Sequence, residues 1–294
     1  MLGARGQLGS ALTSALTSTA GDASIRGVDK DDFDLSDLAA LEREFASFSG
    51  SIVINASAFT DVDGAEKNPD LARAINASAV GKLGELCQRG GVPIIHVSTD
   101  FVFDGALGRA YRESDTTHPL SVYGQTKWQG EQLLLASGAK AIVLRTAWLW
   151  STTHKSFVTT MLRLARERTE LSVVDDQVGS PTWAADLARA IATLATRIRR
   201  EPAAGEQLAG LYHLAGEGAV DRCSFARAIL ELDPKRSEHK CTKVQPVSSD
   251  AFPLPAKRPT FAPLDCSLAA SKLGLRLPPW RESLRDALAL RTSA

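Results

Sequence analysis

The chain has 294 residues, 44% of them hydrophobic, and its 34 Lys and Arg balance its 34 Asp and Glu. This length is ample for one large α/β domain or two unequal ones with a substantial core. A formal net charge of zero gives no electrostatic reason to expect binding to nucleic acid or to an anionic membrane, so local groups must hold any anionic ligand.

The cysteines and the apolar runs bear on the compartment. Four cysteines stand far apart and form no CxxC or Cys/His cluster, namely Cys87, Cys223, Cys241 and Cys266. They indicate reduced thiols in a cytosolic protein, and metal binding is not expected. No apolar run reaches the ~18–20 residues of a membrane-spanning helix. The residues after Arg5 also lack the apolar stretch of a signal peptide. We therefore expect a cytoplasmic protein.

A glycine-rich turn opens the chain. Gly3, Gly6 and Gly9 are spaced GxxGxxG and lead directly into helical sequence. In a nucleotide-binding βαβ unit, such glycines allow a tight turn, close approach of a pyrophosphate and close helix packing. A buried strand should precede this turn, yet only Met1 and Leu2 do. Either the first strand lies upstream of this numbering or another segment takes its place in the sheet, and we expect the former.

The next elements bear on cofactor choice. A short strand is predicted over Ser24–Asp29 and a helix over about 36–48. An acidic residue at the end of the second strand often binds the ribose hydroxyls of NAD, and Asp29 fits this role. Arg5 and Lys30 stand where they could neutralise the 2′-phosphate of NADP. The sequence therefore leaves NADH and NADPH both open.

Small and polar residues follow two apolar strands. The strand that begins at Ser51 breaks into Ala56, Ser57 and Ala58, and a helix is predicted over about 69–90. Small side chains at the carboxyl end of a strand let a ligand lie against the backbone, where open α/β sheets bind ligands. The strand over 92–100 ends in Ser98, Thr99 and Asp100, and a long loop over 101–121 follows it. The Thr99 hydroxyl could stabilise a reacting oxygen electrostatically.

The helix predicted over about 122–137 carries the clearest catalytic pattern. Tyr123 and Lys127 are four residues apart, so their side chains project from the same helical face. A phenol has an unperturbed pKa near ~10, and a nearby cation favours its ionised form. We therefore expect Lys127 to lower the pKa of Tyr123 towards a range that suits acid–base work. A strand over 139–146 follows, and the alternation up to this point predicts a parallel, doubly wound sheet.

The second half of the chain no longer alternates regularly between strands and helices. It predicts a helix over about 157–168, a strand over 171–174, a turn-rich loop over 175–182, a long helix over 183–199, a linker over 201–210, a strand within 210–216, a helix over 223–232 and a final short helix after a proline-broken stretch. These elements are too few for a second parallel sheet. We expect a smaller α/β substrate-binding lobe packed over the first.

Seven segments together carry a family resemblance: GARGQLG, NASAFTDVD, HVSTDFVFDG, VYGQTK, RTAW, DDQVGSPT and KRP, in this order. Each is weak alone, but their conjunction resembles the extended short-chain dehydrogenase/reductases, and within them the dTDP-4-dehydrorhamnose reductase family. The resemblance implies a Rossmann-like fold, a nucleotide-sugar substrate, and reduction of its 4-keto group with NADPH or NADH. It divides the chain into a dinucleotide-binding domain (1–146 plus about 182–205) and a substrate-binding lobe (about 147–181 and 206–294).

The resemblance also implies site residues. The catalytic set falls on Thr99, Tyr123 and Lys127. The cofactor-binding positions fall on Gly3, Gly6, Gln7, Leu8, Gly9, Asp29, Ala56, Ser57, Ala58, Tyr123 and Lys127. The substrate-side positions fall on Thr99, Asp100, Trp148, Gln177, Pro181 and Arg258, of which Arg258 or a helix N-terminus would hold the diphosphate. Phe101 departs from the family, where a tyrosine is usual, and the lost hydroxyl should alter affinity more than chemistry.

Other functions remain alternatives. A sugar-nucleotide 4,6-dehydratase would carry Asp-Glu after the threonine, whereas Asp100 is followed by Phe101. An epimerase would retain its cofactor, which sequence cannot distinguish from exchange. A regulatory subunit that binds NADP without turnover would not need a hydroxyl, a phenol and a lysine to converge, although the short start keeps this alternative open. Dimers and a Mg²⁺ requirement occur among such reductases, but the sequence shows no ligand cluster for a metal.

Overall fold

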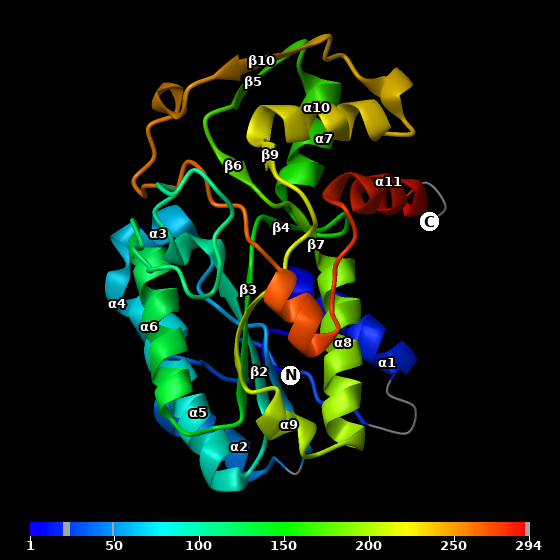
Figure 1. Ribbon diagram of the computed structural model, residues 1–294. Coiled ribbons are helices and arrows are strands. Elements are labelled where there is room, and N and C mark those ends of the chain that lie inside the picture. Colours follow the sequence, from blue (N-terminus) through cyan, green and yellow to red (C-terminus); the bar gives the residue numbers. More distant parts are fainter. Residues whose placement is uncertain (20–23, 49, 292–294) are drawn as a thin grey trace.

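The computed structural model describes residues 1–19, 24–48 and 50–291 (Figure 1). The helices are α1 (Gln7–Thr19), α2 (Leu38–Ala46), α3 (Val62–Lys67), α4 (Pro69–Arg73), α5 (Ala79–Gly90), α6 (Val122–Ala136), α7 (Phe157–Glu167), α8 (Ala184–Arg200), α9 (Ala204–Gln207), α10 (Arg222–Leu232) and α11 (Trp280–Leu290). The strands are β1 (Val53–Asn55), β2 (Ile94–Thr99), β3 (Ala141–Thr146), β4 (Leu149–Trp150), β5 (Glu170–Val174), β6 (Val178–Gly179), β7 (Thr182–Trp183), β8 (Gly210–His213), β9 (Val220–Asp221) and β10 (Lys243–Val247). Single 3₁₀ turns occur at Asp100–Val102, Arg236–Glu238 and Ser249–Ala251, and π turns at Ala74–Ser78 and Ala269–Leu273.

A parallel sheet with the order β1-β2-β3-β8 forms the centre of the larger lobe. Leu2 extends this order, because it bridges Asn55 on one side and Val28 on the other, both in parallel. Met1 and Leu2 thus lie where the sequence predicts the first strand. The strand predicted over Ser24–Asp29 is wrong in its extent. Within residues 24–29 only Val28 forms a β-bridge, and its partner is Leu2.

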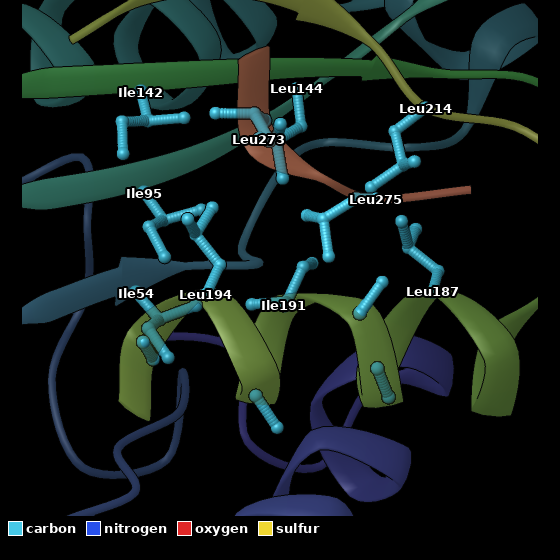
Figure 2. Packing of buried hydrophobic residues seen from close by; sticks show 14 of the residues in the cluster. Ile54, Ile95, Ile142, Leu144, Leu187, Ile191, Leu194, Leu214, Leu273 and Leu275 are labelled. Atoms are coloured by element: carbon cyan, nitrogen blue, oxygen red, sulfur yellow. The ribbon is translucent and has the colours of Figure 1, made fainter. Parts of the chain in front are cut away.

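Helices cover both faces of the sheet, which confirms the predicted doubly wound fold. Alternate residues of a strand point to opposite faces, and Figure 2 shows Ile54, Ile95 and Ile142 packing towards Ile191 and Leu194 of α8. The same face contacts α1. The opposite face packs on α2, α5 and α6 through a second buried cluster that includes Val53, Ile94, Val143, Leu83 and Leu134.

Two C-terminal segments pack with the main sheet, whereas the sequence-based division assigns residues from about 206 onward to the substrate-binding lobe. Strand β8 pairs in parallel with β3, from Ile142 opposite Gly210 to Arg145 opposite His213. Leu273 and Leu275 also point into the core beside α8, as Figure 2 shows. The position of β8 depends on its pairing with a strand far away in the sequence, and the hydrophobic pattern of β8 alone does not predict that partner.

The smaller lobe has its own apolar core. Its buried side chains come from β4, β5, β7, α7, α10 and α11, and the largest are Trp150, Trp183 and Phe225. Strand β10 pairs in parallel with β5, and β9 pairs antiparallel with β6. The loop predicted over 175–182 contains the short strand β6 and the first residue of β7. In Figure 1 this lobe lies at the top, above the sheet.

Helix α6 is held closely against the sheet and its neighbours. Its N-cap Ser121 accepts a hydrogen bond from the Gly124 amide. The helix predicted over 69–90 is instead divided into α4, a π turn and α5. At the π turn, the Asn76 side chain bonds the Phe59 backbone and the Thr126 hydroxyl of α6. A Cβ on Gly130 would lie 2.0 Å from the Asn76 carbonyl oxygen, so this glycine permits the close contact.

Candidate active site

A cavity of about 590 Å³ opens at the carboxyl ends of β1, β2 and β3, between the two lobes. This is where open α/β sheets bind ligands. The sequence-predicted residues that line it are Gly3, Gly6, Gln7, Leu8, Asp29, Ala56, Ser57, Ala58, Thr99, Asp100, Tyr123, Lys127, Trp148 and Arg258. Gly9, Gln177 and Pro181 do not line it. Segments separated by more than 200 residues thus meet in one site.

The glycine turn has the geometry of a phosphate cradle. Gly3 has φ +78°, and a Cβ there would lie 2.9 Å from the Ala56 backbone. A Cβ on Gly9 would lie only 1.8 Å from the Gly3 carbonyl oxygen, so Gly9 permits the helix to pack on the turn. Helix α1 begins at Gln7, which faces the cavity with Leu8. Amides at a helix N-terminus favour an anion, so these residues fit the pyrophosphate of a dinucleotide.

Asp29 is fixed at the far end of this turn. Its carboxylate accepts hydrogen bonds from the Arg5 and Lys30 backbone amides, both at 2.8 Å. The Arg5 guanidinium turns away to an ion pair with Asp31, and Asp32 lies 3.8 Å from it. The acidic residue is therefore held at the cavity, while the nearby cation is engaged by other carboxylates.

Lys127 is buried, with 2% of its surface exposed. Its Nζ donates to the Val97 carbonyl oxygen at 2.7 Å and lies 3.3 Å from His96 Nε2. Burial lowers the pKa of Lys127 to about 8, and the negative charge of Glu131 partly offsets this effect. The ammonium is thus aligned by the end of β2, one helical turn from Tyr123.

Tyr123 behaves differently from the sequence-based expectation. Burial raises its pKa to about 12, the Asp100 charge adds to the increase, and a hydrogen bond with Thr99 opposes it. The expected lowering of this pKa by Lys127 is therefore wrong for this structure, because burial of the phenol has the largest effect. The Lys127 ammonium donates instead to the Val97 carbonyl. The Phe101 ring packs edge-on against the Tyr123 ring, with 5.4 Å between centroids. The phenol consequently stays protonated well above neutral pH.

Asp100 is a buried carboxyl group beside the phenol. Its Oδ1 accepts a hydrogen bond from Thr99 Oγ1 at 3.1 Å, whereas its buried Oδ2 has no partner among the described residues. Burial raises the pKa of Asp100 to about 7, although the Thr99 hydrogen bond and the Arg222 charge act in the opposite direction. An unpaired carboxyl oxygen in a ligand-sized cavity can accept a hydrogen bond from a substrate hydroxyl.

Sequence reasoning missed the polar pair beneath Lys127. Asn55 accepts a hydrogen bond from the Ser57 amide through Oδ1, which directs its Nδ2 to His96 Nδ1 at 3.0 Å. Burial holds the pKa of His96 well below its usual range, and the Lys127 charge adds to this. Asn55 and His96 lie opposite each other in the register of β1 and β2. Only this pairing could have identified His96, since within its apolar strand it resembles a core residue.

Sequence reasoning also missed Arg222, the first residue of α10. Its guanidinium lies over the Trp148 ring, 3.5 Å from the centroid, and lines the cavity. Trp148 has φ +42°, a left-handed conformation that non-glycine residues rarely adopt. Gln177 lies outside the cavity, but its carbonyl oxygen accepts a hydrogen bond from the Arg222 amide. No local motif marks Arg222.

The described residues were also compared with the requirements of a metal site and of a membrane-spanning helix. There, no group of three or more His, Cys, Asp and Glu side chains could hold a metal ion. All four cysteines are free thiols. In the same part of the chain, no helix has the length and apolar character needed to cross a membrane.

Comparison with known proteins assigns the family. The RmlD substrate binding domain model matches residues 1–292. A dTDP-4-dehydrorhamnose reductase of Mycobacterium tuberculosis is 43% identical over 295 residues, covering 98% of this chain and 91% of that protein. The enzyme of that name from Escherichia coli K12 is 36% identical over 256 residues, covering 87% and 84%.

Solved structures of reductases with the same name are also similar to this chain. A dTDP-4-dehydrorhamnose reductase from Clostridium acetobutylicum superposes with a TM-score of 0.88 at 33% identity, covering 99% of this chain and 98% of that one. The Bacillus anthracis enzyme, solved in complex with NADP, gives a TM-score of 0.87 at 32% identity, covering 98% and 97%. The chain therefore belongs to the RmlD family, that of the dTDP-4-dehydrorhamnose reductases.

Proposed function

We propose that this protein reduces the 4-keto group of dTDP-4-dehydrorhamnose to give dTDP-L-rhamnose, with NADPH or NADH as the reductant. The observation that carries the proposal is the meeting of Thr99, Tyr123 and Lys127 with a glycine turn in one cavity. Relatives of the same name cover nearly the whole chain, and one of them was solved with NADP.

The residues of the larger lobe fit a dinucleotide. Gly3, Gly6, Gln7 and Leu8 would hold its pyrophosphate, and the small residues after β1 would let it lie against the backbone. Lys127 would hold the nicotinamide ribose. When bound, the reduced nicotinamide supplies the hydride for the sugar C4. The protein contributes orientation and electrostatics.

Tyr123 is the proposed general acid. Its high pKa keeps the phenol protonated until negative charge develops on the sugar O4, which is then a stronger base than a phenolate. Thr99 stabilises the same oxygen by a hydrogen bond. The Lys127 ammonium donates to the Val97 carbonyl, which would orient it for the nicotinamide ribose. Burial strengthens each of these interactions because little water screens them.

The smaller lobe is the proposed substrate side. Asp100 and Trp148 reach the cavity and would contact the sugar. Gln177 and Pro181 would act indirectly, since neither lines the cavity. We place the cofactor-binding lobe at 1–146 and about 182–205, with β8 added from its pairing and residues 273–275 from their packing, and the substrate lobe in the remaining residues. A homodimer stays a prediction from the resemblance, and a cytoplasmic location stays a prediction from the composition of the chain.

Cofactor oxidation tests the proposal. Purified protein is mixed with dTDP-4-keto-6-deoxy-L-mannose and with NADPH or NADH in parallel, and the fall in absorbance of the reduced nicotinamide is followed. The proposal requires one equivalent of cofactor oxidised per equivalent of sugar. Turnover of the sugar without net oxidation would favour an epimerase. Cofactor binding without any turnover would favour a regulatory subunit.

A further inference from the structure

Three cations line the cavity, and their side chains have different partners. The Lys127 ammonium donates to the Val97 carbonyl. The Arg258 guanidinium forms a fork with Asp63, with Nη2 2.6 Å from Oδ2 and Nη1 3.2 Å from Oδ1, and also donates to the Ala256 carbonyl. The Arg222 guanidinium has no hydrogen bond and no carboxylate within 4 Å among residues 1–19, 24–48 and 50–291. Of these three side chains, the Arg222 guanidinium is therefore the one with N–H groups available to a ligand.

Stacking fixes the orientation of this guanidinium. Its Cζ lies over the Trp148 indole, 3.5 Å from the ring centroid, and 5.2 Å from the centroid of the Phe157 ring. A Cβ on Gly179 would lie 2.4 Å from the indole, so Gly179 leaves room for Trp148. A stacked guanidinium keeps its N–H groups at the edge, free to form a bidentate pair with phosphate or carboxylate.

The electrostatics of the site favour an anion at this point. Burial of Arg222 and the nearby Arg258 charge both disfavour its charged form, and Asp100 acts in the opposite direction; the pKa of Arg222 is lowered to about 10. The guanidinium therefore stays cationic at neutral pH. Since the whole protein has no net charge, an anionic ligand depends on such a local group.

We infer that Arg222 binds the diphosphate of the nucleotide sugar, with the Trp148 ring as its support. Arg258, which sequence reasoning favoured for this task, chiefly ties its own loop to α3 through Asp63. The inference rests on the proposed function for the identity of the ligand. It does not depend on turnover, because it concerns the binding of a nucleoside diphosphate.

The test is calorimetric titration of the protein saturated with NADP⁺, so that the cofactor site is filled. The probes are dTDP and inorganic pyrophosphate. Arg222→Met should weaken dTDP binding by about 10- to 100-fold, as the loss of a charged hydrogen-bonded pair implies. Arg222→Lys keeps the charge but loses the forked geometry, so its affinity for dTDP should lie between those of wild type and Arg222→Met. Arg227→Met, on the same helix but bonded to the Val244 carbonyl, is the matched control and should bind as wild type.

The outcomes separate this inference from the proposed function. Unchanged binding of both probes by Arg222→Met would overturn the inference and leave the reductase proposal standing. An equal loss of NADP⁺ and dTDP affinity would also overturn it, because it would indicate collapse around Trp148. Pyrophosphate binding that depends on Arg222, in a protein that does not bind dTDP, would support the anion site and count against the proposed substrate. Failure of wild type to bind either probe would overturn both.

Discussion

Glu131 and Arg145 form a buried two-point ion pair that ties α6 to β3. Arg145 Nη2 lies 2.7 Å and Nε 3.2 Å from Glu131 Oε2, and the side chains are 3% and 0% exposed. Ser98 donates to the same carboxylate. Glu131 follows Tyr123 and Lys127 at successive four-residue steps, so one helical face carries all three. The pair thereby fixes the helix that presents the candidate catalytic residues.

The first prediction concerns this pair. Glu131→Gln leaves the Arg145 charge buried without its partner and should lower the free energy of unfolding by about 3–5 kcal/mol. Urea denaturation measures the loss. The control is Glu167→Gln, which removes an exposed i,i+4 pair with Arg163 and should cost under about 0.5 kcal/mol. Equal effects of the two variants would show that the buried pair does not anchor α6.

The second prediction concerns pH and Asp100. Its folded-state pKa of about 7 exceeds the unfolded value, so its contribution to stability is fully present below about pH 4 and is lost as the pH rises towards 7. The free energy of unfolding should fall across this range by at most about 4 kcal/mol from this group. Asp100→Asn, which cannot ionise, should flatten the dependence.

The comparison for Asp100 is Asp70→Asn, since the Asp70 side chain is 98% exposed. Unfolding curves of the three proteins at several pH values between 4 and 7 supply the data. If Asp100→Asn keeps the wild-type slope, the raised pKa has no consequence for stability.

The third prediction concerns cofactor choice. Asp29 is held at the cavity, and the Arg5 guanidinium is engaged by Asp31, so the protein should use NADH at least as well as NADPH. Asp31→Asn releases Arg5 to meet a 2′-phosphate. It should lower the KM for NADPH relative to NADH by about threefold to fivefold, as expected for a surface ion pair worth up to about 1 kcal/mol. A strong NADPH preference in wild type, or no change in the variant, would contradict this account; Asp70→Asn controls for charge alone.

The parts of the site that sequence predicts are local patterns. Tyr123 and Lys127 share a helical face because they are four residues apart, and Thr99 ends an apolar strand that is visible in isolation. The GxxGxxG spacing of Gly3, Gly6 and Gly9 is likewise visible within a few residues. Such features follow from periodicity and turn chemistry.

The parts that sequence did not predict are nonlocal. His96 meets Asn55 through strand register, and Arg222 meets Trp148 across 74 positions. The direction of the Lys127 ammonium depends on the Val97 carbonyl, and the pKa of Tyr123 depends on its burial. Likewise β8 joins the main sheet by pairing with β3. Tertiary packing decides each of these relationships.

The most direct test of the account is the turnover of Tyr123→Phe with saturating reduced cofactor and dTDP-4-keto-6-deoxy-L-mannose. Tyr111→Phe is the matched control, because the Tyr111 hydroxyl bonds Asp104 outside the cavity. The account predicts that kcat of Tyr123→Phe falls by about 10²- to 10⁴-fold, with cofactor affinity retained and Tyr111→Phe near wild type. Near wild-type turnover of Tyr123→Phe would contradict the assignment of Tyr123 as the proton donor.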